Sequence, residues 1–244
     1  NGGGKGKLLR EKVFENGWRQ AGAGDAGAAM GAAMFTWYKY LGNERKADGE
    51  NDSQQGTYLG PKFENGEITD YLKKHNIPYT ELSDEELPEK IADMIADEKV
   101  VGCFQGKMEF GPRALGGRSI IGDARSPKMQ ETMNLKIKFR ESFRPFAPSV
   151  VRERVSDFFE HDGESPYMLL VAPVKKDIRR EMTEEEDKLF GLDKLHVPRS
   201  SIPAITHVDY SARIQTVDGR YNNRYYQIIK KFDEKTGCPV IINT

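Results

Sequence analysis

The chain has 244 residues, of which 37% are hydrophobic and 31% are charged. This length and composition exclude a disulfide-stabilised miniprotein and a wholly disordered chain, and they leave room for one large or two small domains. The 37 Lys and Arg residues nearly balance the 38 Asp and Glu residues, so the formal net charge of −1 provides no global attraction to nucleic acid or to an anionic membrane. Any electrostatic attraction must therefore be local.

The cysteines and the apolar segments favour a cytoplasmic protein. Cys103 and Cys238 lie far apart, each inside an apolar run, which is typical of reduced thiols in a core. No apolar stretch reaches the ~20 residues that cross a bilayer, and no segment resembles a signal peptide. We therefore expect a cytoplasmic location and no membrane partner.

Both ends of the chain suggest an excised piece of a longer polypeptide. The chain begins without Met on a Gly-rich run, and it stops within the β-branched run 238–244, which has no turn after it. We therefore expect that a catalytic group missing from this chain lies outside it.

Helices and strands are expected to mix along the whole chain. A tight turn entering a closely packed helix is predicted over 21–41, and a polar, Gly-rich linker over 42–62. Ser83 and Glu86 form a capping-box pattern at the start of a helix. Helices are predicted over 67–74, 83–96, 129–137 and 221–232, a charged helix or loop over 179–189, and strands over 99–104, 149–151, 167–174 and 238–244. This mixture predicts an α/β or α+β fold.

The strongest local feature is a concentration of cations between Gln105 and Arg154. This window holds 11 Lys and Arg residues but only five acids, which is a local charge of +6 in a neutral protein. Its cations are interleaved with Gly, Pro and Phe residues, in the runs 110–119 and 138–146. A merely solvated face does not need this interleaving.

Anion binding is the function that this pattern favours. Glycines let backbone N–H groups approach an anion, Arg113 and Arg118 offer planar forks for phosphate, and Ser119 adds a hydroxyl donor. Two alternatives remain open: a structural Arg network paired with the acidic helix at 81–98, and a nucleic-acid site in which phenylalanines of the window stack on bases. The absence of a wider basic surface argues against nucleic acid.

Two weaker patterns flank this window. In the Ala- and Gly-rich run 22–31, Asp25 stands at a helix start, where it could ligate a metal or simply cap the helix. In the run 206–216, polar residues alternate with apolar ones, so that one polar side of a strand and its loop could carry His207, Asp209, Ser211, Arg213 and Gln215. Neither a zinc-ligand spacing nor a P-loop or dinucleotide fingerprint is present.

The long runs 105–121 and 133–149 resemble the carboxy-terminal part of the O-carbamoyltransferases, the family of the nodulation-factor, cephamycin, novobiocin and tobramycin enzymes. The runs 207–217 and 237–244 continue the resemblance in order. One departure is Gly117, where members of this family commonly have Asn.

The resemblance implies a two-lobed fold of which this chain holds only part. Residues 1–45 would be the end of an amino-terminal lobe of the actin, hexokinase and sugar-kinase (ASKHA) type, and 46–98 would be a linker with helices. Residues 99–244 would be a YrdC-like lobe, a twisted open sheet with flanking helices.

The resemblance also implies the chemistry and the residues that perform it. The YrdC-like lobe would use carbamoyl phosphate and Mg-ATP to make carbamoyl adenylate, and the other lobe would pass the carbamoyl group to a hydroxylated small-molecule or sugar acceptor at a divalent transition-metal site, for example Fe²⁺. Converging cations offset the repulsion between two phosphates. The expected catalytic residues are Arg113, Arg118, Lys138 and Arg144. The expected nucleotide-binding residues are Ser119, Arg140, Ser211, Arg213 and Asn243. Asp25 is expected to ligate the metal.

Three functions follow as hypotheses. The first is a fragment of an ATP-dependent carbamoyltransferase that forms the adenylate but does not complete transfer. The second is a non-catalytic RNA-binding module, because YrdC-like lobes occur in proteins of tRNA modification. The third is an inert scaffold whose cations are neutralised by the acidic helix.

Overall fold

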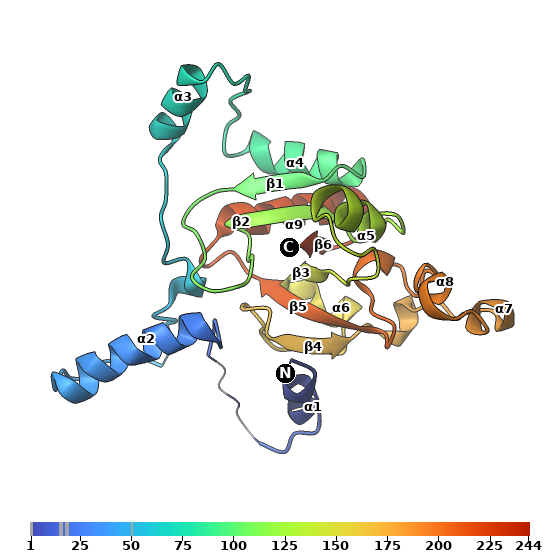
Figure 1. Cartoon of the computed structure of the whole chain (residues 1–244), viewed down its shortest axis with the longest axis horizontal. Coiled ribbons are helices and arrows are strands. Elements are labelled where there is room, and N and C mark those ends of the chain that lie inside the picture. The colour runs from blue at the N-terminus through green and yellow to red at the C-terminus, as the bar shows by residue number, and fades with distance from the viewer. Residues whose placement is uncertain (1, 15–16, 18–19, 50) are drawn as a thin grey trace.

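Six strands form a single open sheet in the order β1-β2-β6-β3-β5-β4 (Figure 1). The computed structural model describes residues 2–14, 17, 20–49 and 51–244. All neighbouring strands are antiparallel except β3 and β5, which are parallel. The strands are β1 (Val101–Phe104), β2 (Arg118–Asp123), β3 (Ala147–Val151), β4 (Leu170–Pro173), β5 (Ser211–Val217) and β6 (Val240–Asn243). The fold is therefore mixed α/β, as the sequence predicts.

The register brings the ends of several strands to the same end of the sheet. Asn243, the last residue of β6, lies opposite Ile121 of β2 and opposite Ala147, the first residue of β3. Phe104, the last residue of β1, lies opposite Arg118, the first residue of β2. The ends of β1 and β6 therefore meet the beginnings of β2 and β3, and the loops 105–117 and 138–146 gather there.

Two amphipathic helices pack together and against the sheet. Helix α4 (Glu86–Ala96) lies along α9 (Asn223–Thr236); α4 contacts β1 and β2, whereas α9 contacts β3 and β6. The apolar face of α9 is fully buried at Tyr225, Ile228, Ile229 and Phe232. Burial of this face supplies the main hydrophobic core between helix and sheet.

Sequence signals account for the ends of these helices. Glu86 N–H donates to Ser83 Oγ at 3.1 Å, and Ser83 N–H donates to the Glu86 carboxylate at 3.0 Å, which confirms the predicted capping box. Asn222 caps α9 by accepting from Tyr225 N–H, and Gly237 ends it in the left-handed conformation with φ +70°.

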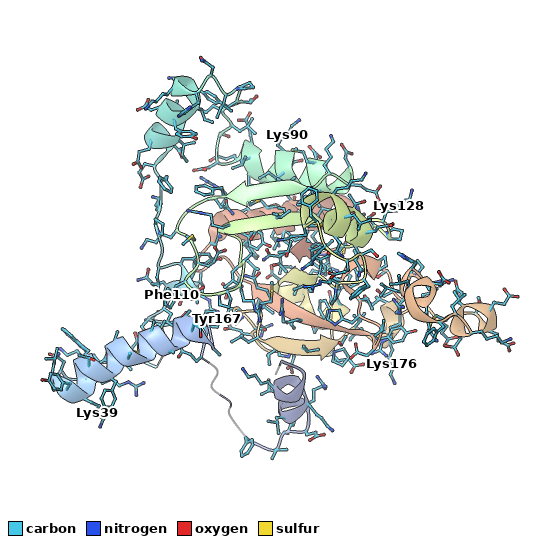
Figure 2. All side chains as sticks on the ribbon, viewed as in Figure 1. Lys39, Lys90, Phe110, Lys128, Tyr167 and Lys176 are labelled. Atoms are coloured by element: carbon cyan, nitrogen blue, oxygen red, sulfur yellow. The ribbon has the colours of Figure 1, made fainter. Side chains whose placement is uncertain are left out.

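The remaining longer helices lie outside this core. Helix α2 (Asp25–Phe35) has no buried residue, so the predicted close packing of this helix is wrong. It continues into a π-helical turn over Thr36–Tyr40, and Figure 2 shows Lys39 at its far tip. Helix α3 (Asn65–Lys74) likewise reaches away from the sheet (Figure 1). The shorter helices are α5 (Met129–Thr132), α6 (Val155–Phe158), α7 (Glu184–Asp187) and α8 (Gly191–Leu195). No helix among the described residues has the length and apolarity that a membrane crossing requires.

Two elements were not predicted from the sequence, and one segment differs from its prediction. The Gly-rich start forms helix α1 (Gly2–Arg10), which packs on β4 so closely that a β-carbon on Gly6 would lie 2.1 Å from the Val171 carbonyl oxygen. Strand β2 was missed because its residues fall inside the cation-rich run. Part of the predicted linker is packed rather than free: Gly56 and Thr57 are buried.

The packed part of this segment forms a strap over the loop that follows β1. Phe110 N–H donates to the Thr57 carbonyl at 2.7 Å, and Gly60 N–H donates to the Met108 carbonyl at 2.9 Å. The Tyr58 hydroxyl donates to the Leu115 carbonyl at 2.6 Å. Residues 55–61 therefore hold the loop 105–117 against the body of the protein.

Candidate functional site: a cation-lined pocket

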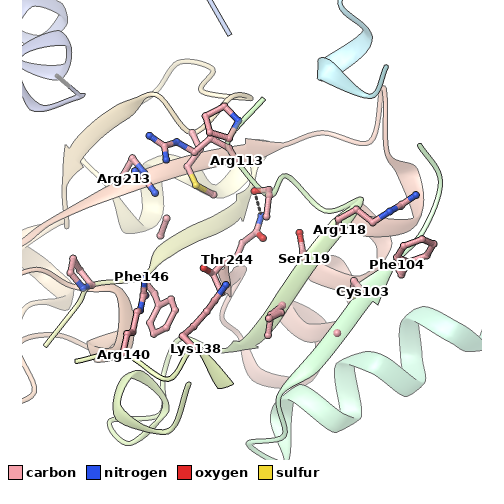
Figure 3. A pocket seen from close by; sticks show the side chains of 18 residues that line it. Cys103, Phe104, Arg113, Arg118, Ser119, Lys138, Arg140, Phe146, Arg213 and Thr244 are labelled. Atoms are coloured by element: carbon pink, nitrogen blue, oxygen red, sulfur yellow. Dashed lines mark hydrogen bonds between the residues drawn. The ribbon is translucent and has the colours of Figure 1, made fainter. Parts of the chain in front are cut away.

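A cavity of about 700 Å³ opens at the sheet edge where the loops 105–117 and 138–146 meet (Figure 3). This volume lies within the usual range of small-molecule sites, roughly 300–1,000 Å³. Its lining comes from β1, β2, β3, β5, the end of β6 and the two loops. We call this cavity the cation pocket. Its cationic lining residues are Arg113, Arg118, Lys138, Arg140 and Arg213.

The cations of the pocket lack acidic partners. No Asp or Glu is among its described lining residues, and none of its five cations forms an ion pair with a described acid. The acidic helix pairs elsewhere: Asp84 contacts Arg224, and Glu89 and Asp93 both contact Lys235 at 2.5 and 2.9 Å. The ion pairs of the described residues therefore speak against the alternative in which this helix neutralises the cations of the pocket.

Burial and mutual repulsion act on the charges in the pocket. Burial lowers the pKa of Arg213, and the neighbouring charge of Arg113 lowers that pKa further. The pKa of Lys138 is lowered by burial and then by the charge of Arg140. The Nε atoms of Arg113 and Arg213 are buried and have no hydrogen-bond partner among the described residues. A bound anion would offset both the burial of these cations and their mutual repulsion.

Arg118 lies in the pocket wall, but its guanidinium is already occupied. Its terminal nitrogens donate to the carbonyls of Gln105 and Gly117, both at 2.9 Å, and of Pro61 at 3.1 Å. The guanidinium stacks on the Phe104 ring at 3.7 Å, and Figure 3 shows Arg118 directed toward Phe104 rather than toward Arg113. Arg118 therefore ties the strap to the loop after β1.

The two other predicted arginines of the 138–146 loop differ in placement. Arg140 lines the pocket, where its Nε donates to Asn134 Oδ1 at 2.6 Å and its guanidinium stacks on Phe146 at 4.9 Å. Arg144 does not line the pocket, and its Nε pairs with the exposed Glu141 at 2.9 Å. The structure therefore does not bring Arg144 together with the other predicted catalytic residues.

Ser119 and Asn243 lie in the pocket lining, whereas Ser211 does not. Ser119 is buried, and its Oγ accepts from Gly116 N–H at 2.8 Å. Asn243 is 1% exposed, and its Nδ2 lies 3.1 Å from the Ala114 carbonyl, the contact dashed in Figure 3. Ser211, at the start of β5, donates to Asp209 at 2.6 Å.

Sequence reasoning missed a buried polar network beneath the pocket. Ser149 Oγ donates to Gln215 Oε1 at 2.6 Å and accepts from the Tyr225 hydroxyl at 2.9 Å. The Nδ2 group of Asn243 contacts Ser149 Oγ at 3.0 Å and Gln215 Oε1 at 2.8 Å. Gln215 Nε2 reaches the Leu115 carbonyl at 3.0 Å. In the sequence, only the presence of polar residues within predicted strands could have indicated this network.

The N–H groups of Gly116 and Gly117 are not free to bind an anion, which corrects the sequence expectation for these two glycines. Glu109 is buried, and its carboxylate accepts from the N–H groups of Leu115 at 2.8 Å, Gly117 at 2.7 Å and Arg118 at 3.1 Å. The N–H of Gly116 is bound to Ser119. An anion in the pocket would therefore meet side-chain cations rather than these two amides. In the sequence, the position of Glu109 as a lone acid among cations could have indicated its role in this loop.

A second cavity, of about 460 Å³, shares Arg113 and Arg213 with the cation pocket. His207 lines it, and burial lowers the pKa of this histidine, with a smaller opposing effect from Asp209. The polar residues predicted to share one side of the run 206–216 therefore go to different places. Arg213 lines the two cavities, whereas Gln215 belongs to the buried network.

Asp25 stands at the first position of α2 and is exposed. Within the part of the chain that the structure describes, no group of three or more His, Cys, Asp or Glu side chains could hold a metal ion. Asp25 alone offers too few ligands for a transition-metal site. Its role as a ligand stays a prediction that needs residues from elsewhere.

Comparison with known proteins identifies relatives over nearly the whole chain. An uncharacterised protein of Synechocystis, sll1178, is 57% identical over 98% of this chain. Nodulation protein NolO of Bradyrhizobium diazoefficiens is 34% identical over 98% of it, and Nodulation protein U of Sinorhizobium fredii is 31% identical over 97%. The chain spans 39%, 40% and 36% of the lengths of these relatives, respectively.

The family profile described as "Carbamoyltransferase C-terminus" matches residues 92–244. The matched range contains every lining residue of the cation pocket and the network beneath it. The chain therefore belongs to the carbamoyltransferase C-terminus family.

Proposed function

We propose that this chain is the carbamoyl-activating part of an ATP-dependent O-carbamoyltransferase. It would bind carbamoyl phosphate and ATP and form carbamoyl adenylate. The longer protein would then pass the carbamoyl group to a hydroxyl of a small molecule or sugar. Family membership supports carbamoyl transfer, and the observation that supports the activating role is the convergence of four further cations besides the engaged Arg118, all without acidic partners, on one cavity.

The electrostatics of the pocket suit two phosphorylated substrates. Carbamoyl phosphate and ATP repel each other, and converging cations offset this repulsion while they hold the reacting groups together. Arg113 and Arg213 supply half-buried side chains whose buried Nε donors are unused, and Lys138 supplies a point charge on a flexible stem. We assign phosphate contacts to these three side chains and to Arg140.

The proposed reaction has two steps. Water first cleaves carbamoyl phosphate into carbamate and phosphate. A carbamate oxygen then attacks the α-phosphorus of ATP, and pyrophosphate leaves with the electron pair of the broken P–O bond. The product is a mixed anhydride with a good leaving group, which an alcohol can attack later. The cations of the pocket would stabilise the charge that collects on the phosphates.

The side chains that line the pocket indicate how Mg²⁺ would be held. Because no described lining residue is acidic, Mg²⁺ would be held by the phosphates of ATP and by water rather than by protein carboxylates. The transition metal of the transfer step would need ligands besides Asp25 from outside the described residues. Mg²⁺ would therefore enter with the nucleotide.

The decisive experiment is exchange of labelled pyrophosphate into ATP by this chain, with and without carbamoyl phosphate. This reaction reports adenylate formation and needs no acceptor. We expect carbamoyl-phosphate-dependent exchange in the wild type and its loss in Arg113→Ala and Arg213→Ala. The matched control is Lys128→Ala, because Lys128 is an exposed cation of the same basic window that does not line the pocket (Figure 2).

The outcomes separate the proposal from the RNA-binding alternative. Exchange that persists in both arginine variants would contradict the assignment of the pocket. Absence of exchange together with tight, salt-sensitive RNA binding by the wild type would overturn the proposed function and support the RNA-binding alternative.

A further inference from the structure

Glu109 is a buried carboxylate inside the most basic part of the chain. Its side chain accepts from three loop amides, those of Leu115, Gly117 and Arg118, at 2.7 to 3.2 Å. The residue is 6% exposed and forms no ion pair with a described cation. All of these contacts require an acceptor, which both oxygens of an ionised carboxylate provide.

The other backbone groups of this loop are also bound. The Ala114 carbonyl accepts from Asn243, and the Gly116 carbonyl accepts from Gln105 Nε2 at 2.9 Å. The Leu115 carbonyl accepts from Tyr58 and from Gln215. The backbone from 114 to 118 is therefore tied at nearly every polar group. The guanidinium of Arg113, directly before it, lines the cation pocket.

We infer that Glu109 is a positioning residue, an internal anion that fills the cradle of loop amides and thereby fixes the approach of Arg113 to the cation pocket. The identification of the bound anion as a phosphorylated substrate rests on the proposed function. The role of Glu109 has a distinctive consequence. A negative charge near an anion site repels the ligand, so Coulomb's law alone predicts tighter anion binding when Glu109 is neutralised. Positioning predicts weaker binding.

The first test measures pyrophosphate binding to the full chain by calorimetry. In Glu109→Gln, the amide NH₂ replaces one acceptor and opposes a backbone donor. We expect about tenfold weaker binding, the size of effect that loss of a hydrogen bond to a charged group produces. Glu109→Asp keeps the charge but shortens the reach, and it should also bind more weakly. The matched control is Glu131→Gln, which removes an exposed acid of the same window and should leave the affinity near that of the wild type. Equal or tighter binding by Glu109→Gln would overturn the inference.

The second test does not depend on any ligand. Amide hydrogen exchange of Leu115, Gly117 and Arg118 should accelerate in Glu109→Gln, whereas exchange of Val150 and Ile241 in the sheet should stay at the wild-type rate. Unchanged protection of the three loop amides would overturn the positioning role. Failure of the wild type to bind pyrophosphate would instead overturn the proposed function, and the exchange result would still decide the role of Glu109.

Discussion

The backbone of Gly116 lies directly against the ring of Tyr225. A β-carbon on Gly116 would come within 2.4 Å of Cδ1 of that ring, and the glycine has φ +111°, which L side chains rarely adopt. Tyr225 is fully buried in α9 and cannot withdraw. The loop that carries Arg113 is thus seated on the helix that builds the core.

This contact predicts the effect of Gly116→Ala on stability. The added methyl group clashes with a buried ring and forces an unfavourable backbone conformation, so we expect a loss of about 2–4 kcal/mol. Urea denaturation measures this loss. Gly102→Ala is the matched control, because a β-carbon there meets nothing within 4 Å, and its stability should stay within about 0.5 kcal/mol of the wild type. Equal effects of the two substitutions would show that the close approach of Gly116 to Tyr225 does not matter for the fold.

A second prediction concerns stabilisation by anions. Burial and then the charge of Arg113 lower the pKa of Arg213, so an anion that contacts both groups relieves their repulsion and binds the folded state selectively. Pyrophosphate at a hundred times its Kd should stabilise the wild type by about 2.7 kcal/mol. The double variant Arg113→Ala/Arg213→Ala should gain almost nothing, as measured by the shift in Tm. An equal shift in wild type and double variant would place the anion elsewhere.

Sequence patterns predicted the chemistry of the loops better than their connections. The capping box at Ser83 and the long amphipathic helices were predictable because they depend on neighbours within one turn. The ties of Tyr58 and Gln215 to the Leu115 carbonyl were not, because they join residues 57 and 100 positions apart.

The candidate site shows the same contrast between residue types, which the sequence predicted, and their contacts, which it did not. Arg113 was predicted from residue type and surroundings, whereas the roles of Lys138, Arg140 and Arg213 came from the family resemblance, and the structure brings all four to one cavity. Arg144 follows the same local pattern, but it lies outside the pocket, where it pairs with Glu141 three residues before it. Whether each cation lines the pocket depended on contacts that the sequence pattern did not specify.

The pH dependence of anion binding should reveal Lys138. Burial and the charge of Arg140 lower its pKa below the ordinary 10.5, so Lys138 loses its charge at a lower pH than an exposed lysine does. The affinity for pyrophosphate should therefore fall as the pH rises toward 10.5. In Lys138→Arg, which stays charged, the fall should move to higher pH, as calorimetric titrations across this range would show. Identical pH profiles would exclude Lys138 as an anion contact.

His207 should contribute to destabilisation by acid. Burial and the charge of Arg213 lower its pKa below the ordinary 6.5, and Asp209 and the Phe146 carbonyl oppose this only partly. The unfolded chain therefore takes up a proton at a higher pH than the folded chain does. Stability from this residue is complete above pH 6.5 and declines as the pH falls from there through the folded pKa. In His207→Gln, Tm should fall less between neutral pH and about pH 5 than it does in the wild type, with roughly the ordinary acid response of the other groups remaining. An unchanged difference in Tm across this interval would contradict the effect.

The buried network beneath the pocket makes the last prediction. Ser149→Ala leaves the buried hydroxyl of Tyr225 without its acceptor, and an unsatisfied buried polar group costs about 1–3 kcal/mol. Tyr226→Phe, which removes a surface hydroxyl bonded to Glu153, should cost under about 1 kcal/mol. In the double variant Ser149→Ala/Tyr225→Phe, both partners of one bond are absent, so its loss of stability should be smaller than the sum of the two single losses. Strict additivity in urea denaturation would show that the two hydroxyls do not act as a pair. The predicted coupling follows from their contact of 2.9 Å in a buried site, where water cannot replace the acceptor that the Tyr225 hydroxyl loses.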